Sequence, residues 1–566
     1  MITLIPEVKE LTRNDGRLRT KAIRSDSKTN SARLNRALTN LPLSPDGVPL
    51  TVAYDDTDSE EYSLVITADA VEIRAKSEQG AFYAIQTLRQ LFEAPDVSCL
   101  EIRDRPDFKY RGFYHDMTRG KIATVDTIKK LIDMMAYYKM NALQLYVEHV
   151  FEFEECRDIN PATSYLTGAE LDEIGAYCEE NFISFEPSLA TFGHMFDILD
   201  QKKYRHLRVL KDYENNVCRW VDRMRHHTID PKLPESLALV KSLIDQYGIH
   251  FDSKYFNICC DETFDLKSSY PKEEEGKLYI DFVKNIIAHV RSKGKSVMMW
   301  ADILLQHPEY ITELPEDTVF LNWAYRADPA ERNIEAFQKL GRTQIVCPGT
   351  TSWSRFCECV DREESNIIKM AEYGYQYGAL GMLNTNWGDY GNPASIEMAL
   401  YGMVLGASKS WAIKTQPDGA FRQGVNTLLY HNGNAVDHLI AISNAQNKVS
   451  WNDTVYAGYK HRAGMDYNPP MDEDRLAFVQ QTYRTVTASL EKEEWTHGDF
   501  KEEMLLAIEG VCVLAELSAK LSGIKTERLT NTADFLTRYR AKWTQKNKES
   551  ELCRIEDIFT YCDSIR

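Results

Sequence analysis

Two adjacent carboxylates, Asp261 and Glu262, are the residues of this chain best suited to chemistry. They follow the apolar run 255–260 (YFNICC), which has the composition of a buried strand, and a threonine and a loop come next. Ligands of parallel sheets bind beyond the carboxyl ends of the strands. Two acids at such a place can be kept in different protonation states and given different tasks. The pair therefore predicts acid-assisted chemistry on a neutral polar substrate, and a sugar fits best.

The middle of the chain, residues 108–411, alternates short apolar runs with amphipathic helical patterns. We expect eight strands, at 111–117, 141–147, 183–189, 255–260, 296–300, 318–323, 343–348 and 379–385. Eight strand–helix units are typical of an α/β fold of the (β/α)8 TIM-barrel type. An open doubly wound sheet is the alternative, but no GxGxxG follows any of these strands.

The flanking regions have other patterns. Residues 1–107 predict a small α/β domain, with strands at 50–54, 61–68 and 70–75, a helix at 80–92 and a linker near 102–108. Residues 412–566 predict a helical domain, with amphipathic runs at 474–492, 499–521 and 530–548. A long charged insertion, 191–232, follows the third barrel strand, and we expect it to form a wall of the site.

Composition excludes several classes of partner. The net charge of −18 and the pI near 5.3 argue against nucleic acids and anionic membranes. The start of the chain lacks the features of a signal peptide, and no apolar run is long enough to span a bilayer. The twelve cysteines form no CxxC pair, which disfavours a zinc site and a disulfide framework. We therefore expect a cytoplasmic protein with free thiols.

Polar and aromatic residues follow most of the expected strands. Four of the nine tryptophans lie there, and indole faces pack well against the C–H face of a pyranose. The candidates at the strand ends are Asp116, Arg119, Glu148, His149, Gly193, His194, Trp300, Asp302, Trp323, Tyr325, Trp353, Trp387 and Asp389.

Several stretches in order resemble the β-N-acetylhexosaminidases of glycoside hydrolase family 20. They lie between about residues 60 and 392 and include RPDFKYRGFYHDMTRG, the Gly-His of ATFGHM, CDET, MMWAD, LNWAY and NTNWGDYG. An Asp-Glu dipeptide alone is a weak signal, but all of these in order at barrel spacing are a strong one. Ala190 stands where the family often has an acid, and CPGTTSWSRF lacks the usual tyrosine, which indicates a divergent branch.

The resemblance implies removal of terminal β-linked GlcNAc or GalNAc by substrate-assisted retaining hydrolysis. Glu262 would be the general acid, and Asp261 would orient the acetamido N–H of the substrate. His194 would polarise Glu262, with Glu148 as the partner of His194 and His149 as the competing candidate.

The remaining implied residues would bind the sugar. Arg119 would hold the 3- and 4-hydroxyls, and Asp389 would accept from the 4- and 6-hydroxyls. Trp300, Trp323 and Trp387 would form a box around the acetamido group, with Trp353 nearby. Tyr325 or Tyr390 would contact the acetamido carbonyl.

Two other functions stay open at this stage. A conventional retaining glycosidase would pair Glu262 with a carboxylate nucleophile such as Asp302, and a silent barrel would only bind glycans. A metal site from His149, His194 and Asp261 is disfavoured, and we expect no cofactor. The expected partner is a glycan with a terminal N-acetylhexosamine, and a homodimer is possible.

Overall fold

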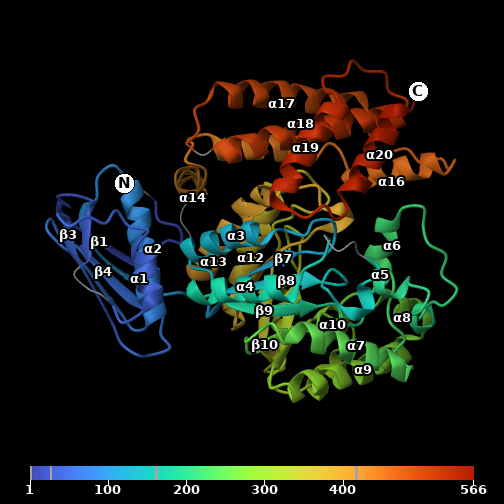
Figure 1. Ribbon diagram of the computed structural model, residues 1–566, viewed down its shortest axis with the longest axis horizontal. Coiled ribbons are helices and arrows are strands. Elements are labelled where there is room, and N and C mark those ends of the chain that lie inside the picture. The colour runs from blue at the N-terminus through green and yellow to red at the C-terminus, as the bar shows by residue number, and fades with distance from the viewer. Residues whose placement is uncertain (1–2, 26–28, 160–163, 415–417, 497, 566) are drawn as a thin grey trace.

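A closed barrel of eight parallel strands forms the centre of the computed structural model, which describes residues 3–25, 29–159, 164–414, 418–496 and 498–565 (Figure 1). The prediction of a (β/α)8 barrel is confirmed. Strands neighbouring in sequence are neighbours in the barrel, and β14 pairs with β7 to close it. The strands are β7 (Tyr110–Asp116), β8 (Ala142–Val147), β9 (Ser184–Leu189), β10 (Tyr255–Asn257), β11 (Ser296–Trp300), β12 (Val319–Trp323), β13 (Gln344–Cys347) and β14 (Gly381–Asn386).

Helices cover the outside of the barrel, as their amphipathic patterns require. Side-chain oxygens cap some of them: Thr124 accepts from the amide of Thr127 at the start of α3, and Thr167 forms a capping box with Glu170 in α4. The outer helices are α3 (Val125–Tyr137), α4 (Gly168–Glu180), α7 (Pro234–Gly248), α9 (Lys272–Ser292), α10 (Asp302–Gln306), α11 (Glu331–Lys339), α12 (Val360–Gln376) and α13 (Leu400–Trp411).

The N-terminal region is a six-stranded sheet with two helices, in the strand order β1-β6-β4-β5-β3-β2. Alternate residues of β5 are buried, as expected of a sheet with one covered face. The strand patterns missed β1, β2 and β6, and β6 extends into the stretch expected to be linker. The elements are β1 (Glu10–Arg17), β2 (Ile23–Ser25), α1 (Ala32–Leu38), β3 (Val48–Tyr54), β4 (Tyr62–Ile66), β5 (Val71–Ala75), α2 (Glu78–Glu93) and β6 (Ser98–Asp104).

A buried carboxylate joins this sheet to the barrel. Asp104, at the end of β6, accepts hydrogen bonds from Tyr62, from Lys139 at 3.1 Å and from the indole of Trp411 at 3.0 Å. All four side chains are almost fully buried, so the charges of Asp104 and Lys139 compensate each other away from water.

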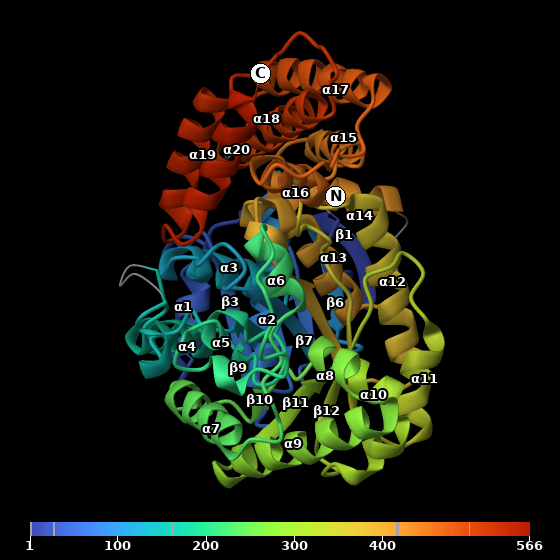
Figure 2. The same cartoon turned by 90° about the vertical axis from the view of Figure 1, so that its right-hand side faces the viewer.

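Helices alone form the C-terminal region, and they pack beside the mouth of the barrel (Figures 1 and 2). They contact the loops that follow β7 and β14: the amide of Lys548 donates to the carbonyl of Ile122, and Tyr539 donates to that of Pro393. We call them the C-terminal helices: α14 (Asp418–Val425), η6 (Asn426–Tyr430), α15 (Ala435–Gln446), α16 (Trp451–Arg462), α17 (Glu473–Lys492), α18 (Gly498–Leu521), α19 (Thr532–Lys546) and α20 (Leu552–Ser564). Within the described ranges, no helix is both long and apolar enough to cross a bilayer.

The fourth strand is shorter than predicted. β10 ends at Asn257, whereas the apolar run suggested a strand to Cys260. Cys259 and Cys260 have φ angles of 57° and 63°, in the left-handed region that interrupts a strand. The side chain of Asn257 accepts from the amide of Cys259, and Tyr279 donates to the carbonyl of Cys260. These side chains bond to an amide and a carbonyl of the irregular segment, while Ile258 and Cys259 still form backbone hydrogen bonds to β11.

Candidate active site

The two acids lie on an irregular segment beyond β10, which we call the acid loop (258–262). Adjacent side chains of a regular strand would point to opposite faces, but Glu262 has a φ of 46°. The turn brings Asp261 and Glu262 to one side, where both approach His194. Gly193 allows this approach, because a Cβ there would lie 2.4 Å from the carbonyl oxygen of Asp261.

His194 lies between the two acids. Its Nε2 is 3.5 Å from Oδ2 of Asp261 and 3.3 Å from Oε2 of Glu262. Burial and the charge of Arg119 disfavour a charged imidazole, yet the two carboxylates raise the pKa of His194 to about 10. The site therefore holds a buried imidazolium against both acids at neutral pH.

Asp302 supports the backbone of the acid loop. Its Oδ2 accepts from the amide of Glu262 at 3.1 Å. Burial, together with the negative charge of Asp261, raises the pKa of Asp302 to about 8. A carboxyl that stays protonated at neutral pH is a poor nucleophile, so this environment suits Asp302 to positioning Glu262.

Arg119 is held by acids on both sides. Its Nε lies 3.1 Å from Oε1 of Glu148, and its Nη1 lies 2.9 Å from Oδ1 of Asp389. The guanidinium also lies over the ring of Trp387, with its carbon 5.0 Å from the ring centroid. Glu148 is the predicted partner of His194, and in the structure its Oε1 accepts from Arg119 and from the hydroxyl of Tyr146.

Asp389 follows β14 and forms an ion pair with Arg119. Burial raises the pKa of Asp389 to about 6, although Arg119 acts in the opposite direction. The carboxylate is 17% exposed, so one face remains open to a ligand. Arg119 and Asp389 thus present a donor and an acceptor side by side, which suits neighbouring hydroxyls.

Aromatic rings cluster beside these polar groups. The indoles of Trp300 and Trp387 have centroids 5.8 Å apart, and Trp323 stacks on Tyr325 at 5.2 Å. Trp353 meets Tyr325 edge-on at 5.0 Å. All four predicted tryptophans are therefore gathered in one cluster with Tyr325.

A hydrogen bond fixes Tyr325 in this aromatic cluster. Its hydroxyl oxygen accepts from Nε1 of Trp387 at 2.7 Å. Tyr390, the alternative from the sequence, lies toward α6 (Arg219–Arg225), and its carbonyl accepts from Trp451. The geometry thus favours Tyr325 as the residue facing a ligand group held by the indoles.

Comparison with known sequences identifies the family. Residues 108–407 match the profile of the glycosyl hydrolase family 20 catalytic domain, and residues 1–105 match that of the family's domain 2. The chain belongs to glycosyl hydrolase family 20.

Named relatives of this family 20 chain are distant. It is 24% identical over 382 residues to a beta-hexosaminidase of Vibrio furnissii, covering 57% of this chain and 58% of the relative. It is 26% identical over 308 residues to human hexosaminidase D, covering 50% of this chain and 61% of the relative. The matches therefore span only about three fifths of each relative's length.

Solved structures share the fold. The chitobiase of Flavobacterium johnsoniae superposes with a TM-score of 0.63 at 18% identity, and the alignment covers 99% of both chains. An exo-β-N-acetylglucosaminidase of Vibrio harveyi gives a TM-score of 0.60 at 18% identity, covering 75% of this chain and 77% of that one.

Sequence reasoning missed several residues of the family 20 site. Tyr146 is buried inside β8 and contacts Glu148, Arg119 and Trp387, but its position within an apolar strand pattern gave no signal. Asp197 comes from the insertion and forms an ion pair with Arg219. Its Oδ2 also lies 3.6 Å from His149, whose pKa burial lowers to about 4.

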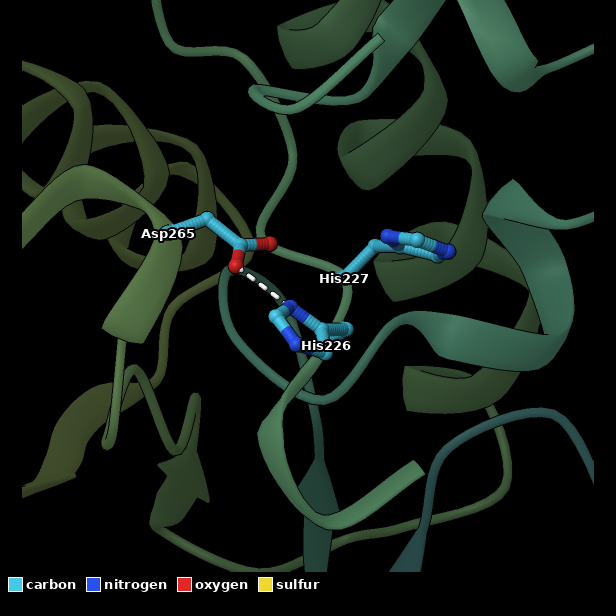
Figure 3. Close-up of side chains that lie close together, drawn as sticks. All are labelled: His226, His227 and Asp265. Carbon is cyan, nitrogen blue, oxygen red and sulfur yellow. Dashed lines mark hydrogen bonds and ion pairs between the residues drawn. The ribbon is translucent and has the colours of Figure 1, made fainter. Parts of the chain in front are cut away.

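The insertion is tied to the helix that follows the acid loop. Figure 3 shows Asp265, from α8 (Phe264–Ser269), accepting from the ring of His226 at 2.6 Å. Its other oxygen accepts from the amide of Thr228 at 2.8 Å. His227 points away from this pair and stacks on Phe196. Both oxygens of Asp265 thus bind protein donors, and the expected wall of the site is fastened beside the acids.

Proposed function

We propose that this family 20 chain is an exo-acting β-N-acetylhexosaminidase that removes terminal β-linked GlcNAc or GalNAc. One observation carries the proposal: the acid pair lies at the same end of the barrel as a cluster of four indoles that contains Tyr325. A cluster of this kind suits the methyl and carbonyl of an acetamido group, which glucosides lack. The names of the relatives, beta-hexosaminidase and hexosaminidase D, support the same substrate class.

The proposed reaction uses the acetamido oxygen of the substrate as nucleophile. It attacks the anomeric carbon while Glu262 donates a proton to the leaving oxygen, and a cyclic oxazolinium forms. Asp261 accepts from the acetamido N–H and stabilises the positive charge that develops there. Glu262 then takes a proton from the water that opens the ring. Two displacements at one carbon leave its configuration retained.

Recognition of the terminal sugar is assigned to the other side of the site. Arg119 donates to the 3- and 4-hydroxyls, and Asp389 accepts from the 4- and 6-hydroxyls. The hydroxyl of Tyr325 donates to the acetamido carbonyl, and the face of an indole packs against the sugar ring.

The conventional retaining mechanism is less well supported. It requires an ionised Asp302 facing the anomeric carbon, but that carboxyl is bonded to the amide of Glu262, and its pKa is raised to about 8. A silent glycan-binding barrel has no need of a buried imidazolium between two acids.

Free thiols support the further proposal of a reducing compartment. All twelve cysteines carry free thiols, and only Cys553 is exposed. Disulfides are common in oxidising compartments and rare in the cytoplasm.

The deciding experiment compares 4-nitrophenyl β-GlcNAc with 4-nitrophenyl β-glucoside, with and without a thiazoline mimic of the oxazolinium. We expect cleavage of the first only, blocked by the thiazoline. Cleavage of both, insensitive to the thiazoline, would favour a protein nucleophile. Cleavage of neither would contradict the proposed substrate class.

A further inference from the structure

We propose that the C-terminal region, the C-terminal helices together with Glu551 at the start of α20, positions the substrate site, with Glu551 and Trp451 as positioning residues. They act through the backbone beside Arg119 and Asp389, the two residues assigned to the sugar hydroxyls. The inference rests on the proposed function for those two roles. Its structural part, the control of one loop by the C-terminal helices, stands on the contacts below.

The loop that carries Asp389 has an unfavourable backbone. We call residues 389–392 the grip loop. Tyr390, Gly391 and Asn392 have φ angles of 54°, 91° and 49°, three successive residues in the left-handed region. Residues that carry a side chain rarely adopt these backbone angles. Three such residues in succession persist only where contacts from the surrounding structure hold them. The contacts that hold the grip loop therefore also decide where the Asp389 carboxylate lies.

Trp451 supplies one of these contacts directly. Its Nε1, at the start of α16, donates to the carbonyl of Tyr390 at 2.9 Å, and the indole is almost fully buried. This hydrogen bond fixes the peptide between Tyr390 and Gly391, one residue beyond Asp389. Its donor belongs to the C-terminal helices and its acceptor to the barrel mouth.

Glu551 supplies the second contact through α6. Its carboxylate accepts from the indole of Trp220 at 2.8 Å and from both terminal nitrogens of Arg223, at 2.8 and 2.9 Å. The indole of Trp220 lies against Gly391, where an added Cβ would be 2.6 Å from a ring carbon. Glu551 thus holds α6 against the grip loop through these hydrogen bonds. Figure 2 shows α6 beneath the C-terminal helices.

The backbone of Glu551 reaches the arginine side of the site. Its amide donates to the carbonyl of Gly120 at 3.3 Å, next to Arg119. Gly120 packs against the carbonyl of Gly391. The loop that carries Arg119 and the loop that carries Asp389 therefore meet beside Glu551. Burial alone would raise the pKa of Glu551, but the charge of Arg223 lowers it to about 2. The ion pair of Glu551 and Arg223 therefore stays charged near neutral pH.

The test uses two conservative variants. Glu551→Gln keeps the shape and the backbone contact but removes the charge, and Trp451→Phe removes only the N–H donor and part of the ring. Each should raise KM for 4-nitrophenyl β-GlcNAc about tenfold, the size of one well-made hydrogen bond, with kcat changed less than about threefold. Matched controls are Glu549→Gln, an exposed carboxylate two residues away, and Trp411→Phe, a buried indole bonded to Asp104.

A double-mutant cycle separates positioning from general stability. In an Asp389→Asn background, Glu551→Gln should lose most of its effect on KM, since the carboxylate it positions is gone. Equal effects in both backgrounds, or an equal KM rise in the controls, would overturn the proposal. If the wild-type chain cleaves β-GlcNAc and the variants behave additively, this inference alone fails.

Amide hydrogen exchange tests the structural part without any activity. Glu551→Gln and Trp451→Phe should speed exchange in peptides covering 388–393 and 119–122, while peptides of the acid loop stay unchanged. Unchanged exchange in the first two peptides would overturn the proposal even if the chain has another substrate.

Discussion

The acid loop and the grip loop each place a carboxylate at the mouth of the barrel, but different parts of the chain hold them there. Each follows a barrel strand, and each contains left-handed backbone: at Glu262 in the acid loop, and at the three residues after Asp389 in the grip loop. The acid loop is held by parts of the barrel: Asp302 accepts from the amide of Glu262, and Tyr279 donates to the carbonyl of Cys260. The grip loop is held by Trp451 of the C-terminal helices, and by Trp220 of the insertion, which Glu551 fixes in place.

The difference separates two tasks. The groups assigned to bond breaking are supported by barrel residues and by His194 at the start of the insertion, whereas Asp389, assigned to sugar recognition, lies in a loop that is also held by the C-terminal region. We therefore expect changes near the acid loop to alter kcat and changes near the grip loop to alter KM.

The largest effects should come from the acid pair. Glu262→Gln should lose about 10²–10⁴-fold in kcat on substrates with poor leaving groups, and less with 4-nitrophenol, which needs little protonation. Asp261→Asn should lose about 10²–10³-fold on every substrate, since the developing positive charge loses its partner. Steady-state kinetics with aryl and disaccharide substrates test both. Near-normal kcat in Asp261→Asn would contradict the substrate-assisted mechanism.

Arg119 should show the next largest effect, on binding. Arg119→Asp should cripple binding, because a third carboxylate would lie beside Glu148 and Asp389. Arg119→Lys keeps the charge but loses the planar fork, and should raise KM about 10- to 100-fold with a smaller change in kcat. Substrate titrations provide the measurement, with thermal denaturation as the check on folding. A lower kcat with an unchanged KM in Arg119→Lys would contradict the assignment of Arg119 to substrate binding.

Tyr325 should have a smaller effect, because a single neutral hydrogen bond is involved. Tyr325→Phe should lower kcat/KM for β-GlcNAc substrates about tenfold. Tyr375→Phe, at an exposed tyrosine, is the matched control. An unchanged kcat/KM would move the acetamido contact to another donor, with Tyr390 the next candidate.

Asp302→Asn should have the smallest kinetic effect and the clearest pH signature. The folded pKa of about 8 exceeds the ordinary 3.8, so the folded state binds this proton more tightly. The contribution of Asp302 to stability is therefore fully present below pH 4 and is lost as the pH rises through 8. The Asn variant should remove this loss, which thermal denaturation from pH 5 to 9 would show. A collapse of kcat at all pH values would instead revive Asp302 as a nucleophile.

The barrel could be predicted from sequence because its strands are continuous apolar runs separated by helical periods. The strand-end rule then located Arg119, Asp261 and Asp389, since side chains at those ends converge whatever their loops do. The same rule could not show that β10 stops at Asn257. Cys259 and Cys260 are apolar enough for a strand, and their left-handed angles are accompanied by a local side-chain bond from Asn257 and a tertiary contact from Tyr279.

Contacts between residues that are far apart in the sequence were the second feature that the sequence could not predict. Glu148 was chosen as the partner of His194 from the family resemblance, and nothing in the sequence showed that its Oε1 would accept from Arg119 and Tyr146. Glu551 lies 328 positions from Arg223 and follows no motif, so nothing in its surroundings in the sequence marks it.

The bond from Trp387 to Tyr325 has a directional consequence. The indole N–H occupies one of the two lone pairs of the phenolic oxygen, so the hydroxyl group keeps one proton to donate and one lone pair with which to accept. An amide carbonyl can use that proton, whereas the ammonium group of a deacetylated glucosamine has no lone pair and could only donate to the oxygen that already accepts from the indole. With the function proposed above, this bond would therefore favour an acetamido group over an ammonium group beside Tyr325.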